Sequence, residues 1–383
     1  MSSTLFSKSP SLLTDFGSIT DQLDLDTFSG RFLRSFVDKA PSHLIDNVDT
    51  KMLILNVDDL HLPITINERE FENSYVCSPF GHFVSYAYDQ IQFVKNRKVR
   101  SGIHSMIKLM EMLLRSADLN RVIIVNNFLF STVLYPTLTS DQIQTITSFL
   151  SEKYPDYAIL FRSVNPNHPD HLEDSLRNCR YDLIPCREVY LTDPLDPKVF
   201  KSRMLKSDLK ILKKSEYNVL SNNQISPEHA PRLKQLYRLL NVDKYSKVNP
   251  QFNENFFIIA LEQNLLDFKA LEKNGRIDAI LGYYNLNGVM TSPLFGYDTQ
   301  LPQELGLYRQ ISTLLSLEAY EKKLLLNGSG GAGSYKKLRR AKPVMESMAV
   351  YSKHLHLRRQ VPWKALRTMM VRIGVKLMKY FEG

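Results

Sequence analysis

The sequence of 383 residues has few of the residues that cross-link a fold or bind a metal ion. Its three cysteines are Cys77, Cys179 and Cys186; they form no C-x-x-C pair and join no histidine cluster. So small and odd a number indicates reduced thiols rather than a disulfide framework. No His-Glu-x-x-His or calcium-loop pattern occurs, so we expect no metal ion. Ser131 and Ser329 lack a Gly-x-Ser-x-Gly elbow, which argues against a serine hydrolase.

Long hydrophobic runs are also absent. No stretch approaches the roughly 20 apolar residues that span a bilayer, and no basic start followed by an apolar segment marks a signal peptide. We therefore expect a cytoplasmic protein. With 43% apolar residues, the chain can bury the cores of two ordinary domains or of one double-lobed domain.

Acidic residues are scarce at the C-terminal end. Residues 336–383 hold 13 of the 49 Lys and Arg residues but only two acidic residues, Glu346 and Glu382. The rest of the chain is nearly neutral, although the net charge of the whole is +9. Because the positive charge belongs to one segment, sequence-specific binding of nucleic acid is not favoured.

Glycine is scarce too, and four of the 15 glycines lie within residues 328–333. This run formally reads Gly-x-Gly-x-x-Gly, and it differs from a P-loop because Ser334 and Tyr335 replace the required Lys-Ser/Thr. A dinucleotide fingerprint opens a doubly wound sheet, with further strands and helices after it. Only one predicted strand follows this loop, so we do not favour dinucleotide binding.

The hydrophobic pattern predicts a mixed α/β fold with an internal repeat. Both halves contain the order strand, helix, strand, short helix and long strand. In the first half these elements are predicted at 122–125, 140–153, 157–161, 169–178 and 181–191. In the second half a hairpin at 277–284 and 289–295, with Asn287-Gly288 as its turn, precedes elements at 302–323, 324–326, 334–341 and 345–351. We also expect strands within 52–66, a helix over 84–118 and a Lys-rich bracing helix over 196–217.

Several segments resemble motifs of one protein superfamily. They lie at 236–252, 296–309 and 329–339 in the second half and at 73–79, 125–127, 131–132 and 161–165 in the first. Over roughly residues 52–365 the chain resembles bacterial GNAT-superfamily N-acyltransferases, in the branch with tandem lobes that includes the Fem-type peptidoglycan aminoacyltransferases. The resemblance implies two tandem GNAT-like lobes. We place them at 51–193 and 231–356, with a loosely packed N-terminal extension at 1–50, a linker at 194–230 and a basic helix at 357–383.

Two departures from the resemblance matter. GNAT domains usually cradle the acyl-CoA pyrophosphate with a Gln/Arg-x-x-Gly-x-Gly/Ala loop, whereas residues 298–308 contain only Gly306. We expect the donor at the N-terminus of the following helix, contacted by Gly306, Gly328 and Gly330. Similar proteins have phenylalanine at Tyr335 and glycine at Arg340, so Arg340 places a side chain where the chain needs a tight turn.

Acyl transfer to an amine needs a proton acceptor, donors for the oxyanion and an acid for the leaving group. We nominate Asp298, which follows a predicted strand end, and Glu346, which lies in the middle of a predicted strand, as bases. Tyr335 resembles the GNAT tyrosine that can protonate a departing thiolate, and Tyr308, in the first turns of the second-lobe helix, is nominated with it. The competing interpretations are a turn or cap contact for Asp298, an ion pair with Lys336 or Arg339 for Glu346, and core packing for both tyrosines. Candidate substrate contacts are Lys244, Tyr245, Ser246, Asn249, Tyr297, Ser329, Lys336, Arg162 and Asn165.

The C-terminal segment predicts an amphipathic helix that Pro362 opens. Trp363, Leu366, Met370, Ile373, Leu377 and Phe381 recur at helical spacing among basic residues. This composition suits an anionic membrane surface, and it equally suits a helix packed on the core.

We therefore expect an N-acyltransferase that moves an acyl or aminoacyl group from acyl-CoA, an acyl-carrier protein or aminoacyl-tRNA to an amine. No cofactor is expected to bind tightly, and the second lobe, which alone has the glycine loop, should hold the active cleft. The alternative is a non-catalytic binding protein that docks on the inner face of the membrane, or on a partner, through its C-terminal helix.

Overall fold

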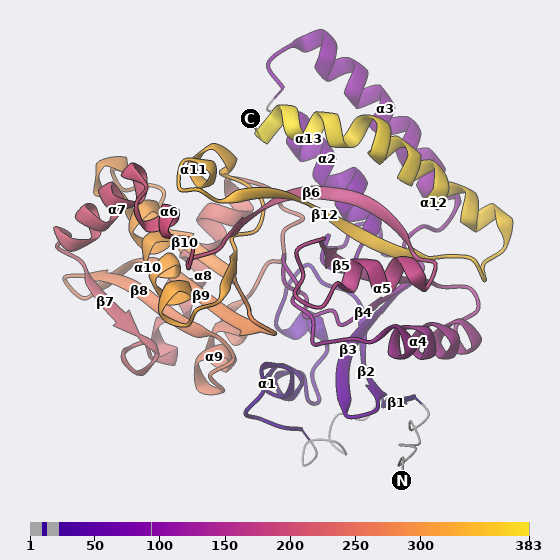
Figure 1. Cartoon of the computed structure of the whole chain (residues 1–383), viewed down its shortest axis with the longest axis horizontal. Coiled ribbons are helices and arrows are strands. Elements are labelled where there is room, and N and C mark those ends of the chain that lie inside the picture. The colour runs from indigo at the N-terminus through magenta and orange to yellow at the C-terminus, as the bar shows by residue number, and fades with distance from the viewer. Residues whose placement is uncertain (1–9, 14–22, 93, 383) are drawn as a thin grey trace.

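A computed structural model describes residues 10–13, 23–92 and 94–382, and it contains one continuous mixed sheet. The strands run in the order β1-β2-β3-β4-β5-β12-β6-β11-β10-β9-β8-β7 (Figure 1). They are β1 Ser11–Leu13, β2 Lys51–Val57, β3 Leu60–Asn67, β4 Val122–Val125, β5 Ala158–Val164, β6 Asp182–Thr192, β7 Asn218–Ser221, β8 Asp267–Lys273, β9 Arg276–Leu286, β10 Val289–Tyr297, β11 Leu325–Asn327 and β12 Lys342–Tyr351. The mixed α/β class predicted from the sequence is confirmed.

Helices cover both faces of this sheet. They are α1 Phe28–Ser35, α2 Tyr86–Ile91, α3 Arg97–Ser116, α4 Ser140–Lys153, α5 Leu172–Asn178, α6 Pro197–Phe200, α7 Arg203–Lys213, α8 Ala230–Arg238, α9 Glu254–Glu262, α10 Leu307–Glu321, α11 Gly333–Lys337, α12 Leu357–Met369 and α13 Val375–Glu382. Three π-helical segments interrupt or extend them, at Gly81–Ser85, Leu239–Asp243 and Met370–Gly374. Short 3₁₀ turns lie at Pro41–His43, Asn222–Gln224, Pro227–His229 and Gln303–Leu305.

The two halves of the repeat exchange their last strands at the centre of the sheet. In the first half β4, α4, β5, α5 and β6 follow one another, and in the second half β10, α10, β11, α11 and β12 do so. However, β5 pairs with β12 of the second half, and β11 pairs with β6 of the first half. The long antiparallel ladder between β6 and β12 joins the halves. The predicted order is therefore confirmed, and the chain exchange binds the halves into one sheet.

Three predicted helices differ from the observed ones for local reasons. The helix expected over 84–118 is broken, because Asn96 accepts hydrogen bonds from the backbone N–H groups of Lys98 and Val99 and so starts α3 as a new helix. Helix α10 begins at Leu307 rather than at 302, because Gly306 adopts a left-handed φ of 64°. Helix α12 begins at Leu357, and Pro362 lies inside it.

The N-terminal segment is not loosely packed where the structure describes it. Phe28, Phe32 and Phe36 of α1 and the following turn are buried in the largest core cluster. The ring of Phe28 stacks on Tyr284 of β9, with 4.0 Å between ring centroids. The prediction for residues 1–50 is therefore wrong over residues 23–50, while residues 1–9 and 14–22 lie outside the described part.

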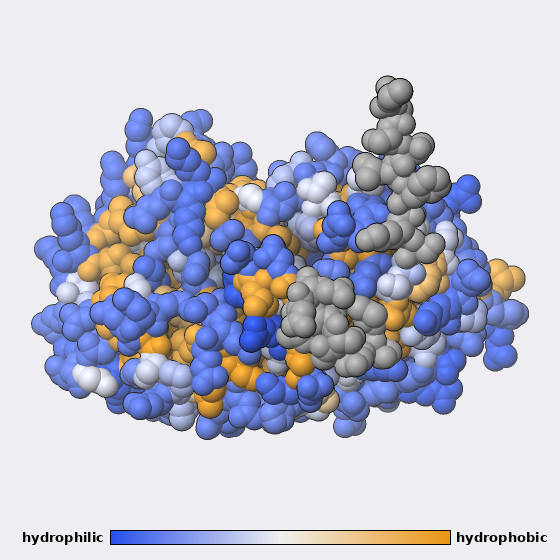
Figure 2. All heavy atoms as spheres, turned by 90° about the horizontal axis from the view of Figure 1, so that it is seen from below, coloured by the Kyte–Doolittle hydropathy of each residue, from blue (hydrophilic) through white to orange (hydrophobic). Residues whose placement is uncertain are grey.

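The two sheet faces carry separate cores. Helices α1, α4, α5, α8 and α9 cover one face and enclose the largest cluster. On the other face, α2, α3 and α12 cover the first-half strands, and α10 covers the second-half strands. Seen from below, the molecule is hydrophilic over most of its rim, with hydrophobic residues gathered toward the middle (Figure 2). The space between the two helix groups of the second face is where the site lies.

Candidate active site

A cavity of about 470 Å³ lies on this second face, between the α2–α3 and C-terminal helices on one side and α10 and α11 on the other. Strand β6 contributes Cys186, Arg187, Glu188, Tyr190 and Thr192 to its wall. This volume is within the range of small-molecule sites. Both halves of the chain line the cavity, so the expectation that the second lobe alone holds the cleft needs correction.

The cavity enters the sheet where β10 and β11 separate. The two strands pair in parallel from Val289 to Thr291 of β10, but β11 ends at Asn327 while β10 continues to Tyr297. The register of β10 against β9 shifts between Thr291 and Leu294. Such an irregularity bends the strand, and Ser292, Pro293 and Phe295 of the diverging part line the cavity. A gap between parallel strands of this kind can admit a ligand without breaking the ladder elsewhere.

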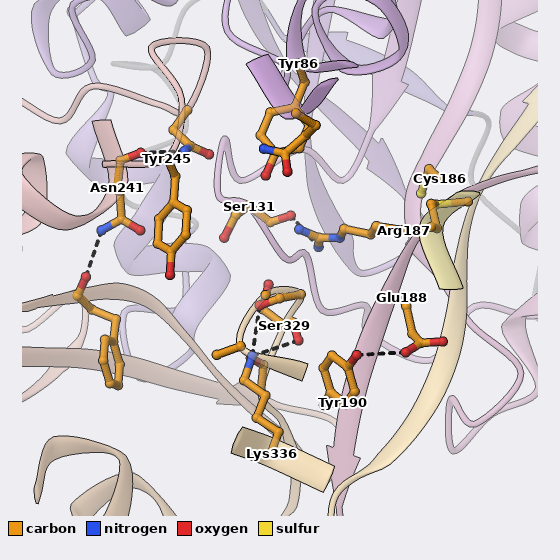
Figure 3. Close-up of a pocket in the computed structure, with 18 of the residues that line it drawn as sticks. Tyr86, Ser131, Cys186, Arg187, Glu188, Tyr190, Asn241, Tyr245, Ser329 and Lys336 are labelled. Carbon is orange, nitrogen blue, oxygen red and sulfur yellow. Dashed lines mark hydrogen bonds between the residues drawn. The ribbon is translucent and has the colours of Figure 1, made fainter. Parts of the chain in front are cut away.

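The glycine loop 328–333 forms one edge of the cavity and runs against β6. A Cβ added at Gly328 would lie 3.3 Å from the Tyr190 carbonyl oxygen, and one added at Gly330 would lie 3.2 Å from that of Glu188. The Nζ of Lys336 donates to the carbonyl oxygens of Gly328 and Gly330 at 2.6 and 2.8 Å (Figure 3). The loop therefore needs these glycines to approach the neighbouring strand closely, and Lys336 fixes its shape.

Arg187 is the charged centre of the site. Its Nε donates to Glu346 Oε1 at 2.6 Å, with side-chain exposures of 18% for Arg187 and 3% for Glu346. Burial alone would lower the pKa of Arg187, but the Glu346 carboxylate raises it. The β6–β12 register shifts here, so that Cys186 is an extra residue between Pro185 and Arg187. Bulges redirect side chains, and this one lies where Cys186 and Arg187 both line the cavity.

A chain of hydrogen bonds links Arg187 to the glycine loop across the two halves. Its Nη2 donates to the Ser131 carbonyl oxygen at 2.7 Å and to Thr132 Oγ1 at 2.9 Å. Thr132 Oγ1 then donates to Ser329 Oγ at 3.0 Å. Figure 3 shows Arg187 pointing toward Ser131, with Ser329 nearby. The position of the loop and that of the guanidinium are thus coupled.

Two tyrosines face the cavity from the α10–α11 side. The rings of Tyr308 and Tyr335 meet edge to face at 4.8 Å, and the Arg339 guanidinium lies 3.3 Å from the centre of the Tyr335 ring. The Tyr335 hydroxyl donates to the buried Asp208 at 3.4 Å. Burial raises the pKa of Tyr335 to about 12 and also raises that of Tyr308. Both hydroxyls are therefore protonated donors at neutral pH.

The opposite wall carries Tyr75, His82 and Tyr86. The Tyr75 ring lies 5.6 Å from His82 and 5.7 Å from Tyr86. His82 Nε2 lies 3.3 Å from the Cys186 carbonyl oxygen, which favours the tautomer that carries the proton on Nε2. Burial, with Arg187 and Arg162 close by, lowers the pKa of His82 to about 3. His82 is thus a neutral imidazole in the folded protein.

Glu188 is the one carboxylate among the described residues that line the cavity. It is 7% exposed and accepts a hydrogen bond of 2.7 Å from the Tyr190 hydroxyl. Lys337 Nζ lies 3.6 Å from the same carboxylate oxygen. Figure 3 shows Glu188 beside Tyr190, on the strand that also carries Arg187. A carboxylate held in this way is placed to accept a proton.

All three π-helical segments of the described chain line the cavity, through His82 and Phe83, Leu240 and Asn241, and Met370 and Gly374. Such segments are rare and recur at functional sites. Asn241 is held by donating to the Phe295 carbonyl oxygen at 2.7 Å.

Half of the residues nominated from the sequence lie together in this wall. They are Tyr245, Asn249, Tyr308, Ser329, Tyr335, Lys336, Gly328 and Gly330. In the polar segment 244–249, Asn249 Nδ2 donates to the Asn241 carbonyl oxygen at 2.6 Å. Tyr245 points into the same space as Tyr86 and Ser131 (Figure 3).

Asp298 does not line the cavity. Its Oδ2 accepts from Arg232 at 2.9 Å and from Arg276 at 2.7 Å, and its Oδ1 accepts from the backbone N–H of Gln300. Burial would raise the pKa of Asp298, but the hydrogen bond from Arg232 and the nearby positive charges lower it. We therefore correct the catalytic assignment: Asp298 anchors a turn and an ion-pair cluster.

Glu346, Tyr297 and Gly306 also lie outside the lining. Glu346 pairs with Arg187, rather than with Lys336 or Arg339, so it positions the guanidinium instead of meeting substrate. Tyr297 belongs to an apolar cluster under α10. Gly306 packs against Ile211 of α7, so that α7 covers the N-terminus of α10 where we expected the donor.

The remaining nominated residues do not line the cavity, and they make contacts elsewhere. Lys244 lies with its ammonium 5.6 Å from the Tyr245 ring centre, and the Ser246 hydroxyl donates to Asp89 at 2.5 Å. Arg162 lies in first-half strand β5, and Asn165 follows it. Arg162 Nη1 donates to Asn127 Oδ1 at 3.1 Å, and Asn165 Oδ1 accepts from a backbone N–H two residues on.

Sequence reasoning missed Arg187, Glu188 and the Tyr75–His82 wall. One signal was present: Arg187-Glu188 is a charged pair in the middle of an otherwise apolar predicted strand. Charged residues in such a strand are costly unless they are paired or line a site. His82 carried no comparable signal, whereas Tyr75 lies within the motif-like segment 73–79.

In residues 10–13, 23–92 and 94–382, no helix combines the length and hydrophobicity that a membrane crossing requires. In the same part of the chain, no group of three or more His, Cys, Asp and Glu side chains is arranged to hold a metal ion.

No protein-family model and no curated protein matches the chain. Among solved structures it is similar to a conserved protein from Bacteroides thetaiotaomicron, at 14% identity and a TM-score of 0.46, over 91% of this chain and 100% of that one. FemX matches at 8% identity and a TM-score of 0.45, over 60% of this chain and 79% of that one. The structure described as L-PGS from Bacillus licheniformis matches at 15% identity and a TM-score of 0.44, over 59% of this chain and 79% of that one. These likenesses concern the fold alone, with identities below 25% and TM-scores below 0.5.

Proposed function

We propose that this protein is an N-acyltransferase, which moves an acyl or aminoacyl group from a carrier to an amine inside the cavity. The observation that carries the proposal is the grouping of complementary groups around one space. A cationic donor, Arg187, a buried carboxylate, Glu188, and two protonated tyrosines, Tyr308 and Tyr335, line the same cavity. These are the groups that acyl transfer requires.

Each group has a role that follows from its chemistry. Glu188 accepts the proton of the amine, directly or through water. The Arg187 guanidinium stabilises the oxyanion, and Glu346, Ser131 and Thr132 hold it in place. Tyr335, whose pKa is raised to about 12, can protonate the departing group. Tyr308 is the second hydroxyl on the same side.

The donor carrier is acyl-CoA, an acyl-carrier protein or aminoacyl-tRNA, and it acts as a co-substrate. A thermal-shift panel with one representative of each tests this. A carrier that binds only the folded protein and is present at a free concentration of 100 times its Kd should stabilise the protein by about 2.7 kcal/mol. If none of the three raises the melting temperature of the full chain, the proposal is wrong.

A second proposal concerns the membrane. Leu109 and Met112 of α3 are 66% and 57% exposed, and Val361 and Val371 of the C-terminal helices are 55% and 51% exposed. Helices α3 and α12 lie side by side (Figure 1), and Lys108, Lys364 and Arg372 are close to these side chains in the sequence. We propose peripheral contact with anionic lipid, as a docking surface for the transferase.

Vesicle co-sedimentation tests this contact. Leu109→Asp with Val371→Asp should abolish binding to phosphatidylglycerol vesicles, whereas Val219→Asp, at an exposed position on β7, should leave it intact. Equal binding by both variants would refute the proposal. Deleting residues 353–383 is a poorer test, because Trp363 and Leu366 are buried in the core.

A further inference from the structure

One end of the cavity is almost entirely apolar. This part of the lining comes from Ile103, Met106 and Ile107 of α3 and from Met370, Leu377 and Met378 of the C-terminal segment. Ala87 and Ile91 of α2 complete this wall. We call this end the helical arm; Phe381, which the sequence placed on the same helix face, lies among the side chains that are not described.

The helical arm is continuous with the polar centre. The same cavity is lined by Cys186 and Arg187 of β6 and by the arm residues, and α13 and the preceding π-helical segment pack directly on β6. Methionines are unbranched and adapt their shape to a flexible ligand, and three of them line the arm. Protein interiors normally leave few voids larger than a water molecule, so an apolar space of this kind suits an apolar ligand.

We infer that the helical arm binds the alkyl chain of a long-chain acyl donor, with the acyl carbonyl at Arg187. This inference names the substrate class of the proposed transferase and so rests on that function. The amine nitrogen attacks the carbonyl carbon, a C–N bond forms, and the C–S or C–O bond to the carrier breaks. The amine proton passes to Glu188, and the carrier leaves with a proton from Tyr335, which solvent replaces as Glu188 releases its own.

Fluorescence of dansyl-aminoundecanoic acid on the full chain tests the arm. Wild type should bind the probe with a blue-shifted emission. Met106→Trp and Ala87→Phe, which fill the arm from two different helices, should each weaken binding at least tenfold. Val99→Trp, at an exposed position of the same helix α3, is the matched control and should bind as wild type does. Absence of binding by wild type, or equal binding by all four proteins, would overturn the inference.

Competition experiments distinguish whether the bound alkyl chain comes from an acyl-CoA or from a lipid. Octanoyl-, decanoyl- and dodecanoyl-CoA should displace the probe with an affinity that rises about fourfold per methylene. If lauroyl-lysophosphatidylglycerol displaces it better than dodecanoyl-CoA, the chain comes from a lipid, which also supports the arm. If acetyl-CoA displaces it as well as dodecanoyl-CoA, the arm inference is wrong. If Met106→Trp and Ala87→Phe weaken probe binding but no acyl transfer is detected, the proposed reaction is wrong, while the inference that the helical arm binds an alkyl chain is supported.

Discussion

The pair of Arg187 and Glu346 offers a quantitative test of how the site is held together. Glu346 is 3% exposed in its side chain and lies 2.6 Å from Arg187 Nε, so each charge depends on the other for its compensation. Removing one partner of a buried pair costs about 3–5 kcal/mol, because the remaining charge stays buried. Glu346→Gln keeps an acceptor for Nε, so we expect about 3 kcal/mol, at the lower end of that range.

A double-mutant cycle isolates the pair. Urea denaturation of wild type, Arg187→Gln, Glu346→Gln and the double variant should give a coupling free energy of about 2 kcal/mol. The exposed pair Arg238–Asp243, with side-chain exposures of 64% and 45%, is the matched control. Its cycle should give less than about 0.5 kcal/mol. Additive effects of Arg187→Gln and Glu346→Gln would show that Glu346 does not hold the guanidinium.

Three further predictions concern stability. The folded protein keeps His82 neutral because its pKa is lowered to about 3, while the same imidazole in the unfolded chain takes up a proton near pH 6.5. As the pH falls from 6 to 4, the free energy of unfolding of wild type should therefore decrease by up to about 1.4 kcal/mol per pH unit more than that of His82→Gln. Identical pH profiles of the two proteins would refute this. Trp363→Ala should lower the free energy of unfolding by about 3–5 kcal/mol in denaturation experiments, because Trp363 is buried. Val361→Ala, at an exposed position of the same helix α12, should change it by less than about 0.5 kcal/mol. Equal effects of the two substitutions would mean that α12 does not pack on the core. Arg340→Gly should raise the melting temperature. Arg340 has a φ of 71°, and this left-handed conformation costs a non-glycine residue about 1 kcal/mol. A lower melting temperature for the variant would contradict the observed turn.

The sequence predicted the order of the repeat because hydrophobic periodicity is local. The strand at 122–125 and the helix at 140–153 were placed at their observed bounds, and the Asn287-Gly288 hairpin was confirmed. The strain at Arg340 was also foreseen from its departure from the family pattern. The exchange of β6 and β12 between the two halves was not predicted from the sequence, because pairing between residues far apart in sequence leaves no periodic signal.

The site was predicted only where a motif is continuous in the chain. The glycine loop, Tyr335 and Lys336 lie on one segment, and the structure brings them together at the cavity. Asp298 was misplaced because a carboxylate at a strand end can equally cap a turn, and Arg232 and Arg276, which decide the matter, come from other elements. Arg187 and Glu188 line the cavity beside a bulge in β6, which no local pattern announces.

Transfer of an isotope-labelled acyl group to an amine, detected by mass spectrometry, would decide whether the cavity is a transferase site. Wild type should form labelled amide from at least one of the three kinds of carrier. Glu188→Gln should lower kcat/KM at least about 100-fold through loss of the proton acceptor, while Glu173→Gln on α5, outside the cavity, should retain activity. Absence of labelled amide from every carrier, or an unchanged rate in Glu188→Gln, would contradict the proposed site.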